Sequence, residues 1–280
     1  MRLMTRLLPV VLVCLATLPA WAQSARASTI ETLFAGHMAQ SSIVVDHSDW
    51  DKLLKTYIRP AEDGLNRVDY RRFKAESHTQ LKAYVRRLEA VDVGKLNRAE
   101  QFAFWSNLYN ARTVDIVLDH YPVKSIRDIN LGGGLFAAIT GGPWKAKVLK
   151  VAGQSLSLDE VEHTILRGLF KDHRVHFAVN CASVGCPNLA LDALTGARLE
   201  AFLDAAAKAF VNSPRGLKFV GGGVHVSKIF VWFQADFGGS DPSVLDHIRR
   251  YAILEIKARM ANVTRIDDSF YDWSLNDAQR

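Results

Sequence analysis

This sequence of 280 residues has few cysteines, few prolines and no large excess of one sign of charge. Three cysteines cannot build a disulfide-rich scaffold, and 8 prolines with 18 glycines are too few for a collagen-like chain. The 35 basic and 29 acidic side chains are dispersed, so the formal charge of +6 forms no basic stripe and predicts no nucleic-acid partner. With 49% hydrophobic and 23% charged residues, the composition is that of an ordinary globular protein rather than a disordered one.

Long apolar runs are missing after the first 22 residues. Those residues carry Arg2 and Arg6 near their start, continue through the apolar run Leu7 to Leu18 and end with Ala20-Trp21-Ala22, the small-x-small pattern that signal peptidase accepts. We therefore expect residues 1–22 to be a cleaved export signal and the mature chain to begin at Gln23, without a transmembrane anchor. The expected location is the periplasm or the extracellular medium.

The remaining sequence predicts one helix-rich domain. Residues 23–46 are small, polar and weakly patterned and are expected to form an exposed tether followed by a short helix. A globular domain over 47–276 and a tail over 277–280 are expected to follow. The expected fold class is α/β, tending toward α+β, with helices around a small sheet. Apolar spacing predicts helices over 50–58, 81–88, 97–120, 158–170, 199–210, 228–237 and 244–260, strands over 147–151 and 175–179, and a hairpin about 221–223.

One segment concentrates groups of a catalytic type, namely His176-Phe-Ala-Val-Asn-Cys-Ala-Ser-Val-Gly-Cys-Pro187. A thiol enzyme needs a nucleophilic cysteine, an imidazole base and a polar group that orients the imidazole. Cys181 is the candidate nucleophile and His176 is one candidate base. On a regular strand, however, side chains five apart point to opposite faces, so His176 reaches Cys181 only if the strand ends by Asn180.

A second candidate base lies on the helix predicted over 158–170. The sequence Ser157-Leu-Asp-Glu160 fits a capping box, which places Glu162 and His163 on the first turns of this helix. His163 is therefore the alternative base, Glu162 the group that orients the imidazole, and Arg167 lies one turn after His163.

Four polar residues are candidate substrate contacts: Asn107, Asn110, Asn180 and Arg167. For Asn107 and Asn110 the alternative is a buried amide that ties a helix to a neighbouring loop. Trp144, Trp232 and Trp273 are interpreted as core or rim aromatics rather than a stacking platform.

Cys181 and Cys186 have a second interpretation, as a disulfide. They are the two cysteines that remain in the exported chain, and disulfides persist in oxidising compartments. A metal site with His163 and His176 is not favoured, because the C-x4-C spacing is wider than structural zinc requires, and we assign no cofactor.

Four ordered motifs resemble the family known as domain of unknown function 547. They are Phe104-Trp-Ser-Asn-Leu-Tyr-Asn-Ala-Arg-Thr113, Ser157-Leu-Asp-Glu-Val-Glu-His-Thr-Ile-Leu-Arg167, the cysteine segment His176 to Pro187, and Tyr271-Asp-Trp-Ser-Leu-Asn276. The similarity is densest from Asn97 to Gly216. The resemblance implies an α/β domain of a kind found in exported bacterial proteins and in plant and animal proteins, and it implies no particular activity.

Two functions are therefore compatible with the sequence. One is a thiol-dependent hydrolase or acyl transferase, papain-like or transglutaminase-like, acting on peptide or cell-wall amides. The other is a non-catalytic envelope binding module in which a Cys181–Cys186 bridge braces the fold. In both cases the expected partner is a small-molecule, peptide or cell-wall ligand.

Overall fold

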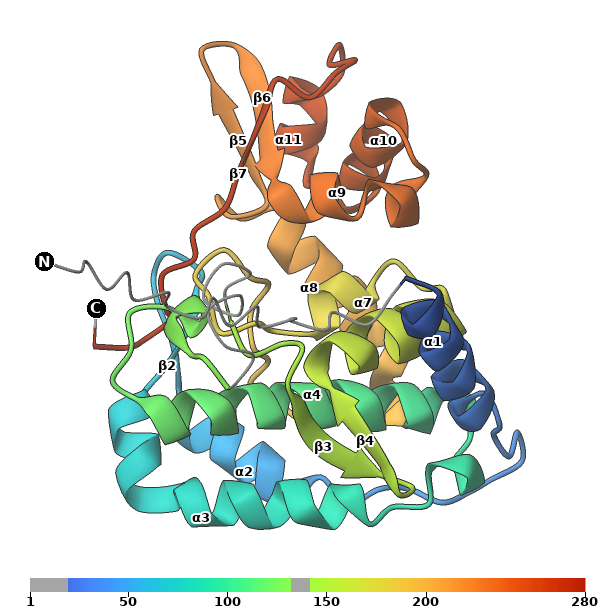
Figure 1. Cartoon of the computed structure of the whole chain (residues 1–280). Helices are drawn as coiled ribbons and strands as arrows, with labels where there is room; N and C mark the ends of the chain where they lie inside the picture. The colour runs from blue at the N-terminus through green and yellow to red at the C-terminus, as the bar shows by residue number, and fades with distance from the viewer. Residues whose placement is uncertain (1–19, 132–141, 280) are drawn as a thin grey trace, which may run out of the picture.

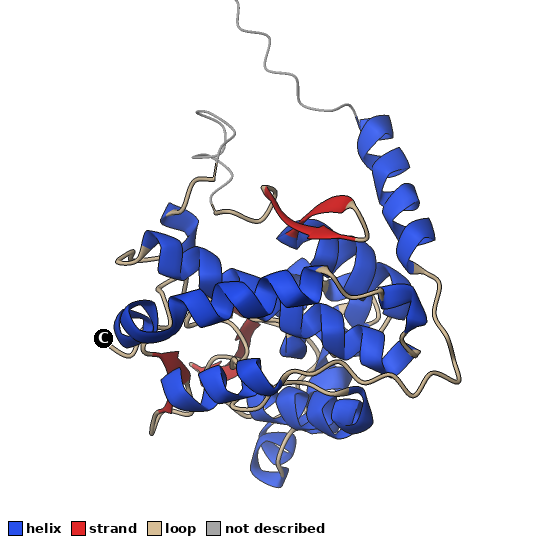
Figure 2. Cartoon of the chain, turned by 90° about the horizontal axis from the view of Figure 1, so that it is seen from below, coloured by secondary structure: helices blue, strands red, loops and turns tan. Residues whose placement is uncertain are grey.

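Helices dominate the structure, a computed structural model that describes residues 20–131 and 142–279 (Figures 1 and 2). The longer helices are α1 (Ala20–Phe34), α2 (Ser48–Tyr57), α3 (Tyr70–Glu89), α4 (Arg98–His120), α8 (Leu199–Val211) and α10 (Asp241–Tyr251). Shorter helical segments are η1 (Val93–Lys95), η2 (Ile126–Asp128), the π-helix η3 (Glu160–Arg167), α6 (Gly168–Phe170), α7 (Val175–Ala178), η4 (Gly196–Arg198), α9 (Lys228–Trp232), η5 (Gln234–Phe237) and α11 (Leu254–Arg259).

The strands form small, separate sheets. They are β1 (Ile58–Pro60), β2 (Asn66–Val68), β3 (Lys147–Val151), β4 (Gln154–Ser157), β5 (Leu217–Val220), β6 (Gly223–Ser227) and β7 (Asp268–Phe270). β1 pairs with β2, and β3 with β4, both antiparallel, whereas β6 lies between antiparallel β5 and parallel β7. The expectation of a helix-rich domain is confirmed, but several small sheets take the place of one central sheet.

Helix α4 runs through the middle of the larger part of the molecule (Figure 1). The side chain of Asn97 caps it by accepting a hydrogen bond from the Glu100 amide at 3.0 Å. α4 is buried on nearly every side because α3, η3, η4 and α8 pack around it. The predicted helix over 97–120 is therefore confirmed.

The buried apolar side chains form two clusters. The α4 cluster packs side chains of α4, including Trp105 and Leu108, against side chains of α2, α3, β3, β4 and η3. The α10 cluster fills the smaller part, drawn in orange and red in Figure 1, with side chains of α8, β5, β6, α9 and α10, including Phe210 and Phe230. Each cluster removes apolar surface from water, which is the main favourable term in folding.

The predicted strand over 175–179 is wrong, because residues Val175–Ala178 form the short helix α7. The Asp172 side chain accepts hydrogen bonds from the backbone and guanidinium of Arg174, and helical bonds follow from Phe177 to Arg174 and from Val179 to Val175. A four-residue apolar run fits a buried helix turn as well as a buried strand, so periodicity alone could not separate them.

The helix predicted over 158–170 is present, and most of it is the π-helix η3 followed by α6. The capping box is also present, since the Glu160 amide donates to Ser157 Oγ at 3.2 Å and the Ser157 amide donates to Glu160 Oε2 at 2.9 Å. The helix predicted over 244–260 is divided into α10 and α11, because Ala252 and Ile253 are extended.

Residues 23–46 differ from the exposed segment that was expected. Ile30 and Phe34 of α1 are buried, and Arg26 pairs with Glu160 at 2.5 Å, so α1 packs against η3. Ile30 and Phe34 lie four apart on one helix face, a pattern too sparse to read in a polar sequence. Most of the predicted export signal, residues 1–19, lies outside the described residues. Within the described ranges, no helix has the length and apolar character needed to cross a membrane.

Candidate functional site

A cleft of about 830 Å³ opens between the α4 cluster and the α10 cluster. One wall comes from α4, η3 and the segment before β3, and it carries Tyr109, Trp144, Glu162 and His163 among others. The opposite wall comes from α9 and the residues beside it, with Ile229, Trp232 and Phe233. Cys181, Cys186 and Tyr271 also line the cleft.

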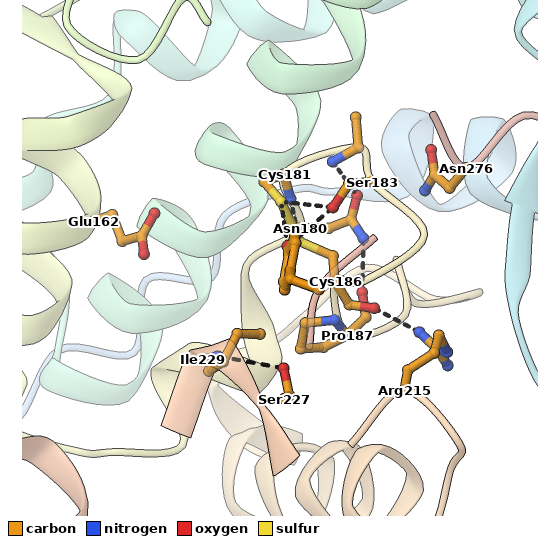
Figure 3. The surroundings of a disulfide bond; sticks show 12 residues. Glu162, Asn180, Cys181, Ser183, Cys186, Pro187, Arg215, Ser227, Ile229 and Asn276 are labelled. Carbon is orange, nitrogen blue, oxygen red and sulfur yellow. Dashed lines mark hydrogen bonds between the residues drawn. A yellow bond between two sulfur atoms is a disulfide. The ribbon is translucent and has the colours of Figure 1, made fainter. Parts of the chain in front are cut away.

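Cys181 and Cys186 are joined as a disulfide (Figure 3). Cys181 is half-buried, whereas Cys186 is only 4% exposed. The backbone N–H of Cys181 donates to Cys186 Sγ at 3.0 Å. The structure therefore supports the disulfide interpretation and does not support a free catalytic thiol at Cys181.

The loop that carries the disulfide is held by several other hydrogen bonds. Asn180 Nδ2 donates to the carbonyl of Pro187 at 2.7 Å, and Arg215 donates to the carbonyl of Cys186 at 2.5 Å. The backbone N–H groups of Val184 and Gly185 donate to the carbonyls of Ser274 and Asp272, each at 2.8 Å. This arrangement brings the 271–274 segment against the disulfide.

Glycine is required at position 185 by this close approach. A Cβ atom there would lie 2.9 Å from the backbone nitrogen of Asp272, a distance that side-chain carbons essentially never adopt. Gly185 thus lets the cysteine loop lie directly beside the segment that carries Tyr271.

Tyr271 and Ser183 complete the polar surroundings of the disulfide, and the sequence alone predicted a role for neither of them. The Tyr271 hydroxyl lies 3.1 Å from Cys181 Sγ and 3.3 Å from Cys186 Sγ, and Ser183 Oγ lies 3.2 Å from Cys181 Sγ. Burial holds the pKa of Tyr271 well above its usual value, so its hydroxyl stays protonated and remains a donor at neutral pH. Tyr271 lies 90 residues after Cys181, and its place in the Tyr271–Asn276 sequence motif was the one signal available.

His176 lines the cleft, with Nε2 2.7 Å from Asp236 Oδ2 and its ring stacked on Phe233 at 4.2 Å. Burial lowers the pKa of His176, although Asp236 acts in the opposite direction. Asp236 was not identified from the sequence. It also accepts two hydrogen bonds from the Arg167 guanidinium, at 2.7 and 3.0 Å, and the bonds from His176 and Arg167 hold the pKa of this carboxyl well below its usual range.

His163 and Glu162 lie on the same wall of the cleft. His163 Nδ1 is 3.1 Å from an Arg167 nitrogen, and its ring lies 5.7 Å from that of Phe233. Glu162 accepts a hydrogen bond from the buried Tyr109 hydroxyl at 2.8 Å, and burial holds the pKa of Tyr109 well above its usual value. All four candidate catalytic residues, Cys181, His163, His176 and Glu162, therefore line one cleft.

The four candidate substrate contacts are already engaged within the fold. Asn107 exchanges hydrogen bonds with the backbone of Leu194, at 2.8 and 3.1 Å, and Asn110 bridges the carbonyl of Ala178 and the amide of Asn180. Asn180 closes the cysteine loop, and Arg167 holds Asp236. A direct substrate contact by any of these residues stays a prediction.

One cluster away from the cleft has the composition of a metal site. His78, Asp115 and Asp119 bring three potential ligand atoms within 4.8 Å of one another. However, Lys82 lies 2.9 Å from Asp115 and 2.8 Å from Asp119, and Arg112 also pairs with Asp115. These side-chain cations already neutralise the carboxylates, so the cluster is a network of ion pairs.

These features define a helix-rich domain with small sheets whose two apolar clusters flank an aromatic cleft lined by a disulfide. Residues 93–211 match the family model described as "Protein of unknown function, DUF547", so this part of the chain is a DUF547 domain, as the resemblance predicted. The matched residues include Glu162, His163, His176 and both cysteines, and they end before α9 and Tyr271. No curated protein and no solved structure matches the chain, and the papain-like or transglutaminase-like fold stays a hypothesis.

Proposed function

We propose that this protein is an exported binding module that takes a cell-wall fragment made of sugar and peptide into the aromatic cleft. The observation that carries the proposal is a group of four aromatic rings that lines the cleft, of which Trp232 is exposed. Trp232 is 46% exposed and its ring lies 4.9 Å from Tyr271 and 5.8 Å from Trp273, which in turn lies 5.8 Å from Trp144. Trp232 is exposed and the other three rings are half-buried. Adjacent aromatic rings that line a cleft and keep part of their surface in solvent are typical of a ligand-binding surface.

Charge around the rings supports a ligand with carboxylates. The Arg127 guanidinium lies 5.2 Å above the Trp273 ring, and Lys145 and Lys228 line the same cleft. Aromatic faces pack against sugar rings and apolar side chains, while a guanidinium pairs with a carboxylate through two hydrogen bonds. Peptide-bearing cell-wall fragments carry both kinds of group.

The location outside the cytoplasm is part of this proposal. It is supported by the signal-like sequence of residues 1–22 and by the Cys181–Cys186 disulfide, since disulfides persist where the environment is oxidising.

Binding is tested by co-sedimentation with purified peptidoglycan and by titration of tryptophan fluorescence with soluble muropeptides. Trp232→Ala should weaken binding by at least about fivefold, because loss of one stacked ring removes more than about 1 kcal/mol. Leu254→Ala, which removes an apolar side chain that is 84% exposed on α11, is the matched control and should bind as the unmodified protein does. Equal binding by both variants, or no binding at all, would contradict the proposal.

A second candidate function, a cysteine-dependent hydrolase or acyl transferase on peptide or cell-wall amides, is supported by the position of Cys181, Glu162, His163 and His176 in one cleft. It requires reduced Cys181. After reduction, a thiol activated by an imidazole should alkylate near neutral pH faster than a model thiol, whose pKa is about 8.5. Release of amine from muropeptides by the reduced protein, abolished in Cys181→Ser, is the expected result. Absence of both activities would exclude this candidate.

A further inference from the structure

The two cysteines of the disulfide differ in how far they are exposed to the cleft. Cys186 is only 4% exposed, whereas Cys181 is half-buried and both line the cleft. An incoming thiolate therefore meets Cys181 Sγ first. Thiol–disulfide exchange proceeds by attack on one sulfur along the bond to the other, so Cys186 Sγ is the leaving group in this geometry.

Two hydrogen-bond donors lie within reach of the sulfur that would leave. The Cys181 backbone N–H donates to Cys186 Sγ at 3.0 Å. The Tyr271 hydroxyl lies 3.1 Å from Cys181 Sγ and 3.3 Å from Cys186 Sγ, and Ser183 Oγ contacts Cys181 Sγ at 3.2 Å. When the bond between the sulfurs breaks, a thiolate at Cys186 can accept both the backbone N–H and the single O–H of Tyr271. Donors to a thiolate lower the pKa of the corresponding thiol, and a leaving thiol with a lower pKa departs faster.

The disulfide contributes little to closing its own loop. The hydrogen bond from Asn180 Nδ2 to the Pro187 carbonyl closes almost the same loop, and Val184 and Gly185 are tied to the 272–274 segment. A bridge between residues five apart removes little entropy from the unfolded chain compared with a long loop.

We propose that Cys181–Cys186 is a thiol–disulfide exchange site that reacts with small-molecule thiols entering the cleft. The external thiolate attacks Cys181 Sγ, a mixed disulfide forms there, the Cys181–Cys186 bond breaks, and its electron pair goes to Cys186 Sγ. A second external thiolate then attacks the outer sulfur of the mixed disulfide. The net result is oxidation of two thiols to one external disulfide, while both cysteines are reduced and take up two protons. This chemistry goes beyond ligand binding and shares only Tyr271 with the aromatic surface.

The test uses glutathione as the thiol and the full protein purified without reductant. Samples quenched with acid are analysed by intact mass and peptide mapping. The expected product is a glutathione adduct on Cys181 with a free Cys186, formed faster in the folded protein than in the same protein unfolded in urea. Reaction only after unfolding, or an adduct on Cys186, would overturn the proposal and leave a structural bridge.

The role of the donor is tested with Tyr271→Phe, which removes one hydroxyl. The rate of adduct formation should decrease by about fivefold, the rate change expected from the loss of one hydrogen bond to the leaving sulfur. Tyr121→Phe removes a hydroxyl that donates to Asp277 at 2.8 Å and should react at the unmodified rate. Equal rates for both variants would overturn the assignment of Tyr271. If Tyr271→Phe does not fold, the position of the glutathione adduct on the unmodified protein still tests the exchange site. Muropeptide binding by the unmodified protein is measured separately, so failure of the exchange proposal is distinguished from failure of the proposed binding function.

Discussion

Asp236 fixes the position of two basic side chains at the cleft. It accepts hydrogen bonds from Arg167 and lies 2.7 Å from His176 Nε2, so removal of its charge would leave a partly buried guanidinium without its anion. Asp236→Asn should lower the free energy of unfolding at pH 7 by about 2 kcal/mol, the typical value for hydrogen bonds to a charged group. Urea unfolding measures this change. Asp246→Asn, at an exposed carboxylate that pairs with Arg249, should cost less than about 0.5 kcal/mol.

The same substitution has a defined pH dependence. The pKa of Asp236 is lower in the folded protein than the value of about 3.9 in an unfolded chain. Its contribution is therefore fully present above about pH 4 and is lost as the pH falls through the folded-state pKa. The difference in the free energy of unfolding between the unmodified protein and Asp236→Asn should stay constant from pH 7 to 5 and become smaller at more acidic pH. A difference that grows on acidification would contradict this account of Asp236.

His247 is a buried imidazole in the α10 cluster. Its ring lies 4.7 Å from His173 and 4.8 Å from Phe237, and its Nε2 has no hydrogen-bond partner among the described residues. Burial lowers the pKa of His247 to about 3 and also lowers that of His173. Below about pH 6.5 the unfolded chain therefore binds protons that the folded protein does not. The free energy of unfolding consequently decreases as the pH is lowered.

We expect this loss to appear between pH 6.5 and 5, before most carboxylates titrate. Each such imidazole contributes up to about 1.4 kcal/mol per pH unit, so His247→Phe should flatten the pH dependence by about 1 kcal/mol per unit. The exposed His37, changed to Phe, is the control and should leave the slope unchanged. If the unmodified protein, His247→Phe and His37→Phe all showed the same dependence of unfolding free energy on pH, folding would not lower the pKa of His247.

At the level of elements, the buried carboxylate of Glu100 joins three segments. It lies on the first turn of α4 and accepts the backbone N–H of Val45 at 2.8 Å and that of Gly196 at 2.9 Å. One oxygen holds the N-terminal segment and the other holds η4. This single side chain therefore connects regions that no local sequence pattern links.

Glu100→Gln should lower the free energy of unfolding by about 2 kcal/mol. Its amide can accept from only one of the two backbone donors, and the other then faces an NH₂ group. Glu76→Gln, on the exposed surface of α3, changes the same atoms and should leave the free energy of unfolding nearly unchanged, because water screens its pairing with Arg72. Thermal or urea unfolding compares them. Comparable losses in the two variants would mean that the ties to Val45 and Gly196 carry little stability.

At the scale of the whole molecule, α1 joins the proposed export signal to the folded domain. The residues that attach α1 to the domain, Arg26, Ile30 and Phe34, all follow the expected cleavage point before Gln23. Cleavage there would leave these contacts intact. We propose that the mature protein begins at Gln23 and keeps the attached part of α1.

Intact mass of the exported protein tests this proposal. Loss of residues 1–22 is expected, and changing Ala20 and Ala22 to arginine should block cleavage, because signal peptidase requires small residues there. The same two changes should leave the thermal unfolding of the domain unaltered. Retention of residues 1–22 in the unmodified protein, or a bound lipid, would refute the proposal.

The sequence by itself determined the elements whose signals are local. The α4 helix, the capping box at Ser157 and the β5–β6 hairpin about 221–223 were predicted correctly, because caps, glycine turns and apolar periodicity act over a few residues. It also placed Cys181, Glu162, His163 and His176 as one candidate group. Their position in one cleft was a hypothesis that the structure supports.

Only the tertiary structure decided which distant groups meet at those residues. Asp236 lies 60 residues after His176 and Tyr271 lies 90 residues after Cys181, and the chain between them carries no pattern that specifies either contact. Likewise, Val175–Ala178 forms a helix because no strand pairs with it and Asp172 begins a helical turn. These outcomes follow from packing of the two apolar clusters, a property of the whole chain, and local propensity is too weak to determine them.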